Sequence, residues 1–491
     1  MRLAVGRRAL AGAAVAALAS VALRLPGIER RSLWLDEALT VSRALRSPAE
    51  NVAIARHNQN PPGYPILLSP WVAAFGTSEA AVRLPSLLAS TAAAGALFLF
   101  ADRFLGFEAA VYASALYLSS EPQLYYAREA RPYALIQLLC VASFFLFLRM
   151  LERPRWSAAI ALGVVNAAAM YCHFSIAFAF VAQLAAALVL APRGAFALYV
   201  ASQAVALALF APWLEALRSN LPEAGRFWLA APEADSLRRV IGELAGGSAS
   251  IAIALVVLVG WGGARLAEPR AGRASRPVPL DRIATLVAWA IVPIALGYAV
   301  SQRIPTFGLR YQLYASLGWF CLVALALAEL PVPPAARAGL AVAVVAAAAL
   351  HLDWSRSRGA DWRSAAAAAV GEVTADSAIV VAPRYGCTPF AYYAAPDAFA
   401  SADVEAGLGR HRVVCAGDGA AADPAALGWP ERVILVAASD APADFWSATA
   451  RLEEAGYRAV AEHRARSLWV GVASVGARSR AAPLARPAGA E

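Results

Sequence analysis

The chain has 491 residues, of which 60% are hydrophobic and only 16% are charged. Soluble globular proteins are about half apolar and about one quarter charged, so this composition excludes an ordinary soluble protein and indicates a membrane protein. The formal net charge is +9 and every one of the 43 basic residues is arginine, but these arginines are scattered among apolar segments, which argues against nucleic-acid binding.

Apolar segments long enough, or almost long enough, to cross a bilayer recur along residues 1–352, since a transmembrane helix needs about 20 mostly apolar residues. The first of them has no distinct cleavage site, so we predict a retained membrane helix rather than a signal peptide. The predicted spans are residues 9–28, 83–101, 106–120, 131–149, 156–171, 173–191, 194–213, 246–265, 282–300, 310–329 and 335–352.

The arginines of short loops predict the orientation, because such loops are enriched in Lys and Arg on the cytoplasmic side. The N-terminus and the loops 149–155 and 262–282 are rich in arginine and are therefore predicted to be cytoplasmic. This orientation places the loops 121–130, 214–245 and 301–310 and the C-terminal region outside a bacterial cytoplasmic membrane.

A twelfth apolar stretch, residues 61–76, is shorter and begins with two prolines. The orientation requires an odd number of spans, so we predict that this stretch lies along the outer interface and that the whole loop 29–82 is outside. Eleven spans then remain. The alternative is one further crossing, which would give thirteen.

From about residue 353 the composition is that of a soluble domain. We predict a small α/β extracytoplasmic domain over residues 353–475, with a helix at Ala443–Ala455 and a disordered tail at 476–491. Cys387 and Cys415 lie in this domain and could pair in an oxidising compartment, although two cysteines alone leave the pairing open. The predicted strands are Ala378–Ala382, Arg412–Cys415, Val433–Ala437 and Leu468–Val472.

Two adjacent carboxylates, Asp36 and Glu37, follow the first span and are flanked by Trp34 and Leu35. Charged groups near a bilayer are costly and usually have a function. The other interpretation is a pair of interfacial acids beside a belt tryptophan.

Further polar clusters fall on the predicted outer side, and this convergence on one face indicates a site rather than scattered interfacial charges. The clusters are Asn58–Tyr64, with two prolines at 61 and 62; Glu79–Ser86; Tyr125–Tyr133; Tyr171–Phe174; and Phe307–Tyr311.

This set of motifs resembles the GT-C superfamily of integral-membrane glycosyltransferases. The nearest branch contains the protein mannosyltransferases, the lipid A aminoarabinose transferase and the related transferases of lipopolysaccharide core. The resemblance covers residues 8–350 and the outer domain that opens with Asp361-Trp362-Arg363. Where the aminoarabinose branch has an acidic-basic pair before the double proline, this chain has Gln59-Asn60, which argues against the same sugar.

The resemblance implies transfer of a sugar from a polyprenyl-phosphate donor to a glycan, lipid or protein acceptor, with inversion at the anomeric carbon. Nucleotide sugars are absent outside the cytoplasmic membrane, so the sugar must arrive on a lipid phosphate. We assign Asp36 as the general base for the acceptor hydroxyl and Glu37 as its partner.

Arginines are the candidates for binding the donor phosphate, because a guanidinium binds phosphate through two hydrogen bonds. Arg83 and Arg310 could instead lie among lipid headgroups, and His173 could be an ordinary interfacial histidine. The candidate substrate-binding residues are Arg83, Arg128, Glu129, Arg131, His173, Arg310 and Tyr311.

No ligand spacing in the sequence supports a metal site, so we predict no metal and no other cofactor. A divalent ion held by Asp36, Glu37, Glu129 and His173 is the alternative. The rival functions are a lipid or glycan transporter and a non-catalytic subunit of envelope assembly; a transporter would need ionisable residues near the membrane midplane and often a repeated half, which the sequence does not show.

Overall fold

The computed structural model describes residues 6–57, 60–220, 231–267, 278–355, 359–417, 425–438 and 452–475. Gln59, most of the predicted helix Ala443–Ala455 and the predicted tail lie outside these ranges. The chain divides into two compact units. The first contains Met1–Pro26, Pro48–Leu67 and Arg83–Trp354, and the second contains Gly27–Ser47, Leu68–Val82 and Ser355–Glu491.

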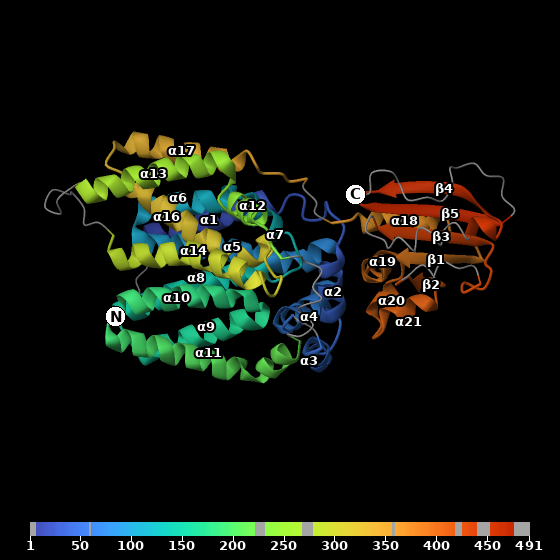
Figure 1. Ribbon diagram of the computed structural model, residues 1–491. Helices are drawn as coiled ribbons and strands as arrows, with labels where there is room; N and C mark the ends of the chain where they lie inside the picture. The colour runs from blue at the N-terminus through green and yellow to red at the C-terminus, as the bar shows by residue number, and fades with distance from the viewer. Residues whose placement is uncertain are drawn as a thin grey trace. The chain divides into compact units, whose positions relative to one another are not determined.

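The first unit is a bundle of helices that lie side by side (Figure 1). Their sequences are mostly alanine, leucine and valine, which suits helices that are apolar around their whole circumference. The helices are α1 (Arg7–Arg24), α3 (Pro48–Arg56), α6 (Phe107–Ser119), α7 (Glu121–Tyr126), α8 (Tyr133–Glu152), α9 (Trp156–Cys172), η1 (Phe174–Ile176), α10 (Ala177–Leu190), α11 (Arg193–Asn220), α12 (Ala234–Leu244), α13 (Gly247–Ala267), α14 (Leu280–Ser301), α15 (Leu309–Gln312), α16 (Ala315–Glu329) and α17 (Pro334–Ala349), while α4 (Gly63–Phe75) and α5 (Glu79–Leu105) contribute to both units.

Five helices, α5, α8, α11, α13 and α14, are long and apolar enough to cross a membrane. Shorter apolar helices stand at the other predicted spans from residue 156 onward, namely at Trp156–Cys172, Phe174–Leu190, Ala315–Glu329 and Pro334–Ala349. The chain is a multi-pass integral membrane protein, as the composition predicted. The interfacial stretch predicted at 61–76 corresponds to α4, whose 13 residues are fewer than a bilayer crossing needs.

The bundle has two ends with different polar contacts, and α8 runs from one to the other. At the end of α8, Glu152 pairs with Arg103 and Arg282 at N···O distances of 2.5 and 2.9 Å. Glu329 accepts a hydrogen bond of 2.7 Å from the backbone N–H of Val278, close to the start of α14, and so lies at the same end. We call this the ion-pair end, defined by Glu152 and Glu329.

Tyr133, at the start of α8, belongs to a cluster with Tyr125, Tyr126, Phe307 and Tyr311. A helix of 20 residues is about 30 Å long, so this cluster is distant from Glu152. We call it the aromatic end, defined by these five residues.

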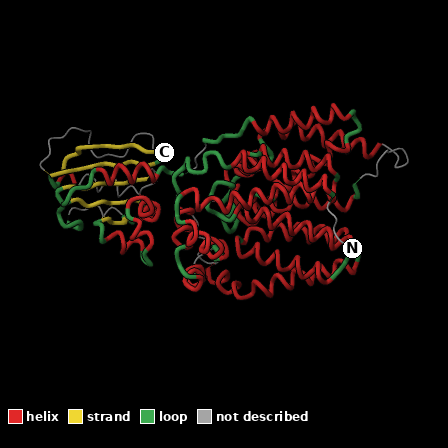
Figure 2. The backbone as a smooth tube through the Cα atoms, turned by 180° about the vertical axis from the view of Figure 1, so that it is seen from behind, coloured by secondary structure: helices red, strands yellow, loops and turns green. Residues whose placement is uncertain are grey.

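The second unit contains a five-stranded sheet, whose strands are yellow in Figure 2 and labelled in Figure 1, with the order β2-β1-β3-β5-β4. β1 is parallel to β2 and β3, with Val380 opposite Val414 and Leu435, whereas β3, β5 and β4 are antiparallel to their neighbours. The mainly helical fold with a small mixed C-terminal sheet confirms the predicted fold class. The strands are β1 (Ser377–Ala382), β2 (Val413–Cys415), β3 (Arg432–Ala438), β4 (Tyr457–Ala465) and β5 (Leu468–Val475).

Helices of the second unit pack beside this sheet, and α18 contacts β3, β4 and β5. α19 contacts α2, the helix that carries the acid pair. Cys387, the first residue of α19, forms a disulfide with Cys415 of β2, with a Cα–Cα distance of 5.9 Å. The helices are α2 (Leu35–Ala44), α18 (Trp362–Gly371), η4 (Arg384–Gly386), α19 (Cys387–Ala394), α20 (Pro396–Ala400) and α21 (Val404–Gly409).

Candidate active site

The aromatic end of the bundle is built from segments that are far apart in the sequence. Tyr133 packs edge-on against Tyr126 and Tyr311, with ring centroids 5.2 and 6.3 Å apart. Val240 and Leu244 of α12 are buried against the same cluster. The cluster thus forms an apolar, aromatic wall to which residues 125–133, 240–244 and 307–313 contribute.

His173 lies in this wall, in the connection between α9 and α10. Its ring stacks on Tyr311 with centroids 4.9 Å apart and lies 6.3 Å from the ring of Tyr133. The backbone N–H of Ser175 donates to Nδ1 of His173 at 3.2 Å, so Nδ1 is an acceptor and the other ring nitrogen, Nε2, carries the proton of the neutral imidazole. The ring is therefore fixed in orientation and in tautomer.

Two arginines act on this imidazole. Arg131 lies over the ring of Tyr133 and Arg310 over the ring of Tyr311, with Cζ 5.7 and 5.0 Å from the centroids. Burial, followed by the positive charges of Arg131 and Arg310, lowers the pKa of His173 to about 3. The structure therefore brings together Arg131, His173, Arg310 and Tyr311, four of the residues predicted from the sequence.

Arg83 is fully buried in the first turns of α5. One turn later, the hydroxyl of Ser86 donates to the carbonyl oxygen of Arg131 at 3.0 Å. Ser86 also shares a hydrogen bond of 2.7 Å with the hydroxyl of Tyr64, just after the double proline. The segments around Arg83, Arg131 and Tyr64 therefore meet at the aromatic end.

Arg128 is buried, and part of its guanidinium is bound to the end of α1. Its Nε donates to the carbonyl oxygen of Arg24 at 2.8 Å and its Nη2 to that of Leu23 at 3.0 Å. Carbonyl groups at a helix C-terminus lack intrahelical donors and carry partial negative charge, so Arg128 caps α1. Arg128 thus has a structural function that the sequence did not predict, while Glu129 beside it is also buried.

Arg24, at the end of the first apolar segment, is not among the residues predicted from the sequence. It is fully buried and donates from Nη2 to the carbonyl oxygen of Tyr117 at 3.2 Å and from Nη1 to the hydroxyl of Ser20 at 2.9 Å. Arg24 and Arg128 together fix the end of α1.

In the second unit, the acid pair lies in the first turn of α2. Glu37 is buried and Asp36 is partly exposed. The residue ahead of the helix, Trp34, has extended backbone, and the hydroxyl of Thr40 donates to the carbonyl oxygen of Asp36 at 2.8 Å. Acidic side chains are favoured at a helix N-terminus, so an acid pair suits this position.

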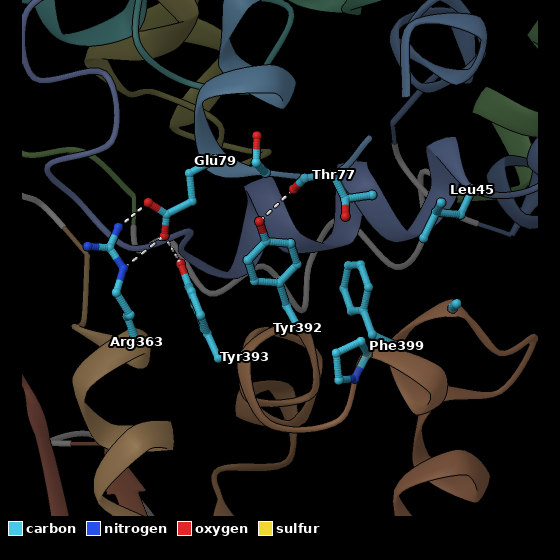
Figure 3. A pocket seen from close by; sticks show the side chains of 10 residues that line it. Leu45, Thr77, Glu79, Arg363, Tyr392, Tyr393 and Phe399 are labelled. Carbon is cyan, nitrogen blue, oxygen red and sulfur yellow. Dashed lines mark hydrogen bonds and ion pairs between the residues drawn. The ribbon is translucent and has the colours of Figure 1, made fainter. Parts of the chain in front are cut away.

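Glu79, Arg363 and Tyr393 form a network in the second unit (Figure 3). Arg363 forms an ion pair with the buried carboxylate of Glu79, and the hydroxyl of Tyr393 donates to the same carboxylate. The backbone N–H of Leu33 donates to the Tyr393 hydroxyl at 2.6 Å. Burial, and then the bond to Glu79, raise the pKa of Tyr393, so the hydroxyl stays protonated as a donor.

This network holds the segment that leads to the acid pair. The Nη2 of Arg363 also donates to the carbonyl oxygen of Glu29 at 2.8 Å, and the hydroxyl of Ser32 donates to the carbonyl oxygen of Ala360 at 3.0 Å. Residues 29–33 are thus bound to the C-terminal domain through backbone groups of Glu29, Arg31 and Leu33 and through the hydroxyl of Ser32. Arg363 and Glu79 lie in motifs that were singled out from the sequence. Nothing in the sequence distinguishes Tyr393, because it is one tyrosine in an ordinary helix.

Within the described parts of the chain, no three His, Cys, Asp or Glu side chains lie close enough together to hold a metal ion.

Comparison with known proteins gives a match to one family model over part of the chain and a similar fold over most of it. The family model of dolichyl-phosphate-mannose-protein mannosyltransferases matches residues 59–215. None of the curated proteins matches the chain.

Solved structures of membrane glycosyltransferases are similar over most of this chain. The oligosaccharyltransferase AglB from Archaeoglobus fulgidus is 13% identical, with a TM-score of 0.53, covering 92% of this chain and 72% of that one. The arabinofuranosyltransferase AftD from Mycobacteria is 17% identical, with a TM-score of 0.50, covering 97% and 42%. ArnT from Cupriavidus metallidurans is 15% identical, with a TM-score of 0.47, covering 96% and 99%.

Proposed function

We propose that this chain, a membrane glycosyltransferase of the GT-C type, transfers a sugar from a polyprenyl-phosphate donor to a glycan, lipid or protein acceptor on the outer side of a bacterial cytoplasmic membrane. The observation that carries the proposal is the meeting of Arg131, Arg310 and the neutral His173 within an aromatic wall at one end of the bundle. Two guanidinium groups beside apolar rings suit a phosphate ester with a hydrocarbon tail.

The relatives support the choice of donor. AglB, which shares the fold, has been solved in complex with a dolichol-phosphate, and the matching family model is that of dolichyl-phosphate-mannose-dependent enzymes. A polyprenyl phosphate is a good leaving group, so the reaction needs stabilisation of negative charge more than protonation of the leaving oxygen. Arg83, Arg131 and Arg310 are proposed to supply that stabilisation.

The acceptor hydroxyl needs a general base, and we assign this function to Asp36, with Glu37 as its partner. Asp36 is partly exposed, whereas Glu37 is buried, so Asp36 is the acid that a substrate can reach. Its carboxylate would accept the proton of the acceptor hydroxyl while the oxygen attacks the anomeric carbon. Attack opposite the phosphate would invert that centre.

The orientation predicted from the arginines supports an outer location for the C-terminal domain. The Cys387–Cys415 disulfide agrees with this, because such bonds persist in oxidising compartments outside the cytoplasm. The ion-pair end, which carries Arg103, Arg149 and Arg282, would then face the cytoplasm.

The test is envelope glycan and lipid profiling of a deletion strain that is rescued with wild type, with Asp36→Asn or with Asp102→Asn. Loss of a general base typically lowers the rate 10²- to 10⁴-fold, so the Asp36→Asn strain should lack the modified glycan. Asp102→Asn removes a partly exposed carboxylate of α5 and should rescue fully. Rescue by Asp36→Asn equal to wild type would end the catalytic assignment.

A further inference from the structure

A pocket of about 480 Å³ opens in the second unit beside the Glu79 network (Figure 3). Its walls come from the end of α2, from the residues before α5 and from α19 and α20 of the C-terminal domain. Pockets of roughly 300–1,000 Å³ are the size that encloses small molecules. None of the residues assigned above to the donor or to the acid pair lines it.

The pocket has an apolar wall and a polar wall. Leu45, Pro396 and Phe399 supply the apolar side. Phe399 is held by an edge-on contact with Tyr392, with ring centroids 5.2 Å apart, and the hydroxyl of Tyr392 is bound to the carbonyl oxygen of Thr77 at 2.6 Å. The ring is therefore a fixed surface.

The polar wall offers hydrogen-bonding groups without a net charge. Glu79 neutralises Arg363, because Nε and Nη2 of the guanidinium both bind its carboxylate. Among the described residues, Nη1 of Arg363 and the hydroxyl of Thr77 make no hydrogen bond, and both residues line the pocket. An anion such as phosphate would find its positive partner already paired, so this wall favours a neutral ligand with hydroxyl groups.

We infer that this pocket binds the neutral saccharide portion of the acceptor, an inference that rests on the proposed function and names its substrate class. A sugar ring has an apolar face of C–H groups, which fits Phe399, and hydroxyl groups at its edge, which fit Arg363 and Thr77. The pocket lies in the same unit as the acid pair, and Tyr393, which lines it, also binds Leu33 three residues ahead of Asp36. Binding of a saccharide here would place the acceptor on the unit that carries the base.

The test uses the full chain in lipid nanodiscs and saturation-transfer difference NMR. The probes are methyl α-D-mannopyranoside, methyl β-D-galactopyranoside and N-acetylglucosamine. Ala400→Trp places a large side chain on an exposed residue that lines the pocket, and Ala367→Trp does the same on an exposed residue of α18 that does not line it. We expect a signal from at least one probe that weakens at least tenfold in Ala400→Trp and is unchanged in Ala367→Trp.

Equal signals in both tryptophan variants, or no signal from any probe with the wild type, would overturn the inference. Inorganic phosphate should not compete with the saccharide, and competition would show that the site selects anions instead. Asp36→Asn should keep the saccharide signal while losing transfer. Retention of transfer by Asp36→Asn would refute the proposed base and leave the result for the pocket standing.

Discussion

The two ends of the helical bundle use the same residue type, arginine, in different ways. At the ion-pair end, arginines meet carboxylates: Glu152 is bound by Arg103, Arg149 and Arg282 within 3.2 Å. At the aromatic end, Arg128 binds the carbonyl oxygens of α1, and Arg131 lies over a tyrosine ring.

At the ion-pair end the arginines hold helices together, whereas at the aromatic end they are proposed to bind the donor. A carboxylate between several guanidinium groups offsets part of their charge and joins α5, α8 and α14. A guanidinium over an aromatic face is a geometry that also suits hydrogen bonds to a phosphate. The ion-pair end is therefore expected to determine stability, and the aromatic end to determine donor binding.

Among the tests of this difference between the two ends, Arg310→Gln should have the largest effect. A hydrogen bond to a charged group contributes about 1.5–3 kcal/mol, so losing this cation should raise the KM for the polyprenyl-phosphate donor by about 10- to 100-fold. The measurement is a transfer assay with membranes from the rescued deletion strain, using the donor sugar that glycan profiling identifies.

The matched control is Arg337→Gln, which removes a guanidinium at the ion-pair end. Arg337 pairs there with Glu108 at an N···O distance of 3.0 Å. It should leave the donor KM within about twofold of wild type, since surface ion pairs contribute only about 0–1 kcal/mol. Equal effects of the two substitutions would remove the functional distinction between the ends.

Glu152→Gln should act on stability rather than on donor binding. The three arginine partners of Glu152 would lose their shared carboxylate. Because the side chains of Glu152 and its partners are 20–38% exposed, solvent screening limits the loss in the free energy of unfolding to about 1–2 kcal/mol. Thermal unfolding in detergent should show a lower midpoint, with an unchanged donor KM. An altered KM with an unchanged midpoint would reverse the roles of the two ends.

Most of the fold could be predicted from the sequence, because apolar segments of bilayer length are determined by composition and length alone. The predicted strands at 378–382, 412–415, 433–437 and 468–472 match β1, β2, β3 and β5 to within a few residues. β4 was missed, because its sequence from Tyr457 to Ala465 is an edge strand with exposed charged residues and no clear alternation.

The sequence could single out several residues that the structure brings together, but not the contacts that each of them makes. Arg131 and Arg310 could be singled out because cations near a membrane boundary are costly, and both act on His173. Arg128 has the same residue type in the same loop, yet it caps α1, and only the packing of α1 against this loop determines that. Tyr393 could not be found at all, because its function depends on a tertiary contact with Leu33.

The smallest predicted effect is the contribution of His173 to the pH dependence of stability. The sign of this effect follows from the burial of His173 beside two arginines. The folded state keeps the imidazole neutral because its pKa is about 3, whereas the unfolded chain takes up a proton below about 6.5. This contribution to stability is therefore complete above pH 6.5 and is lost as the pH falls from about 6.5 toward 3. Between pH 7.5 and pH 6, the free energy of unfolding of the wild type should therefore fall by about 0.8 kcal/mol more than that of His173→Gln, by proton linkage.

The measurement is thermal unfolding of the wild type and of His173→Gln across this pH range in detergent. Parallel pH profiles would mean that the imidazole is protonated in the folded state as well. Arg131 and Arg310 would then not lie close enough to His173 to suppress its charge, and the cluster that distinguishes the aromatic end from the ion-pair end would not exist as described.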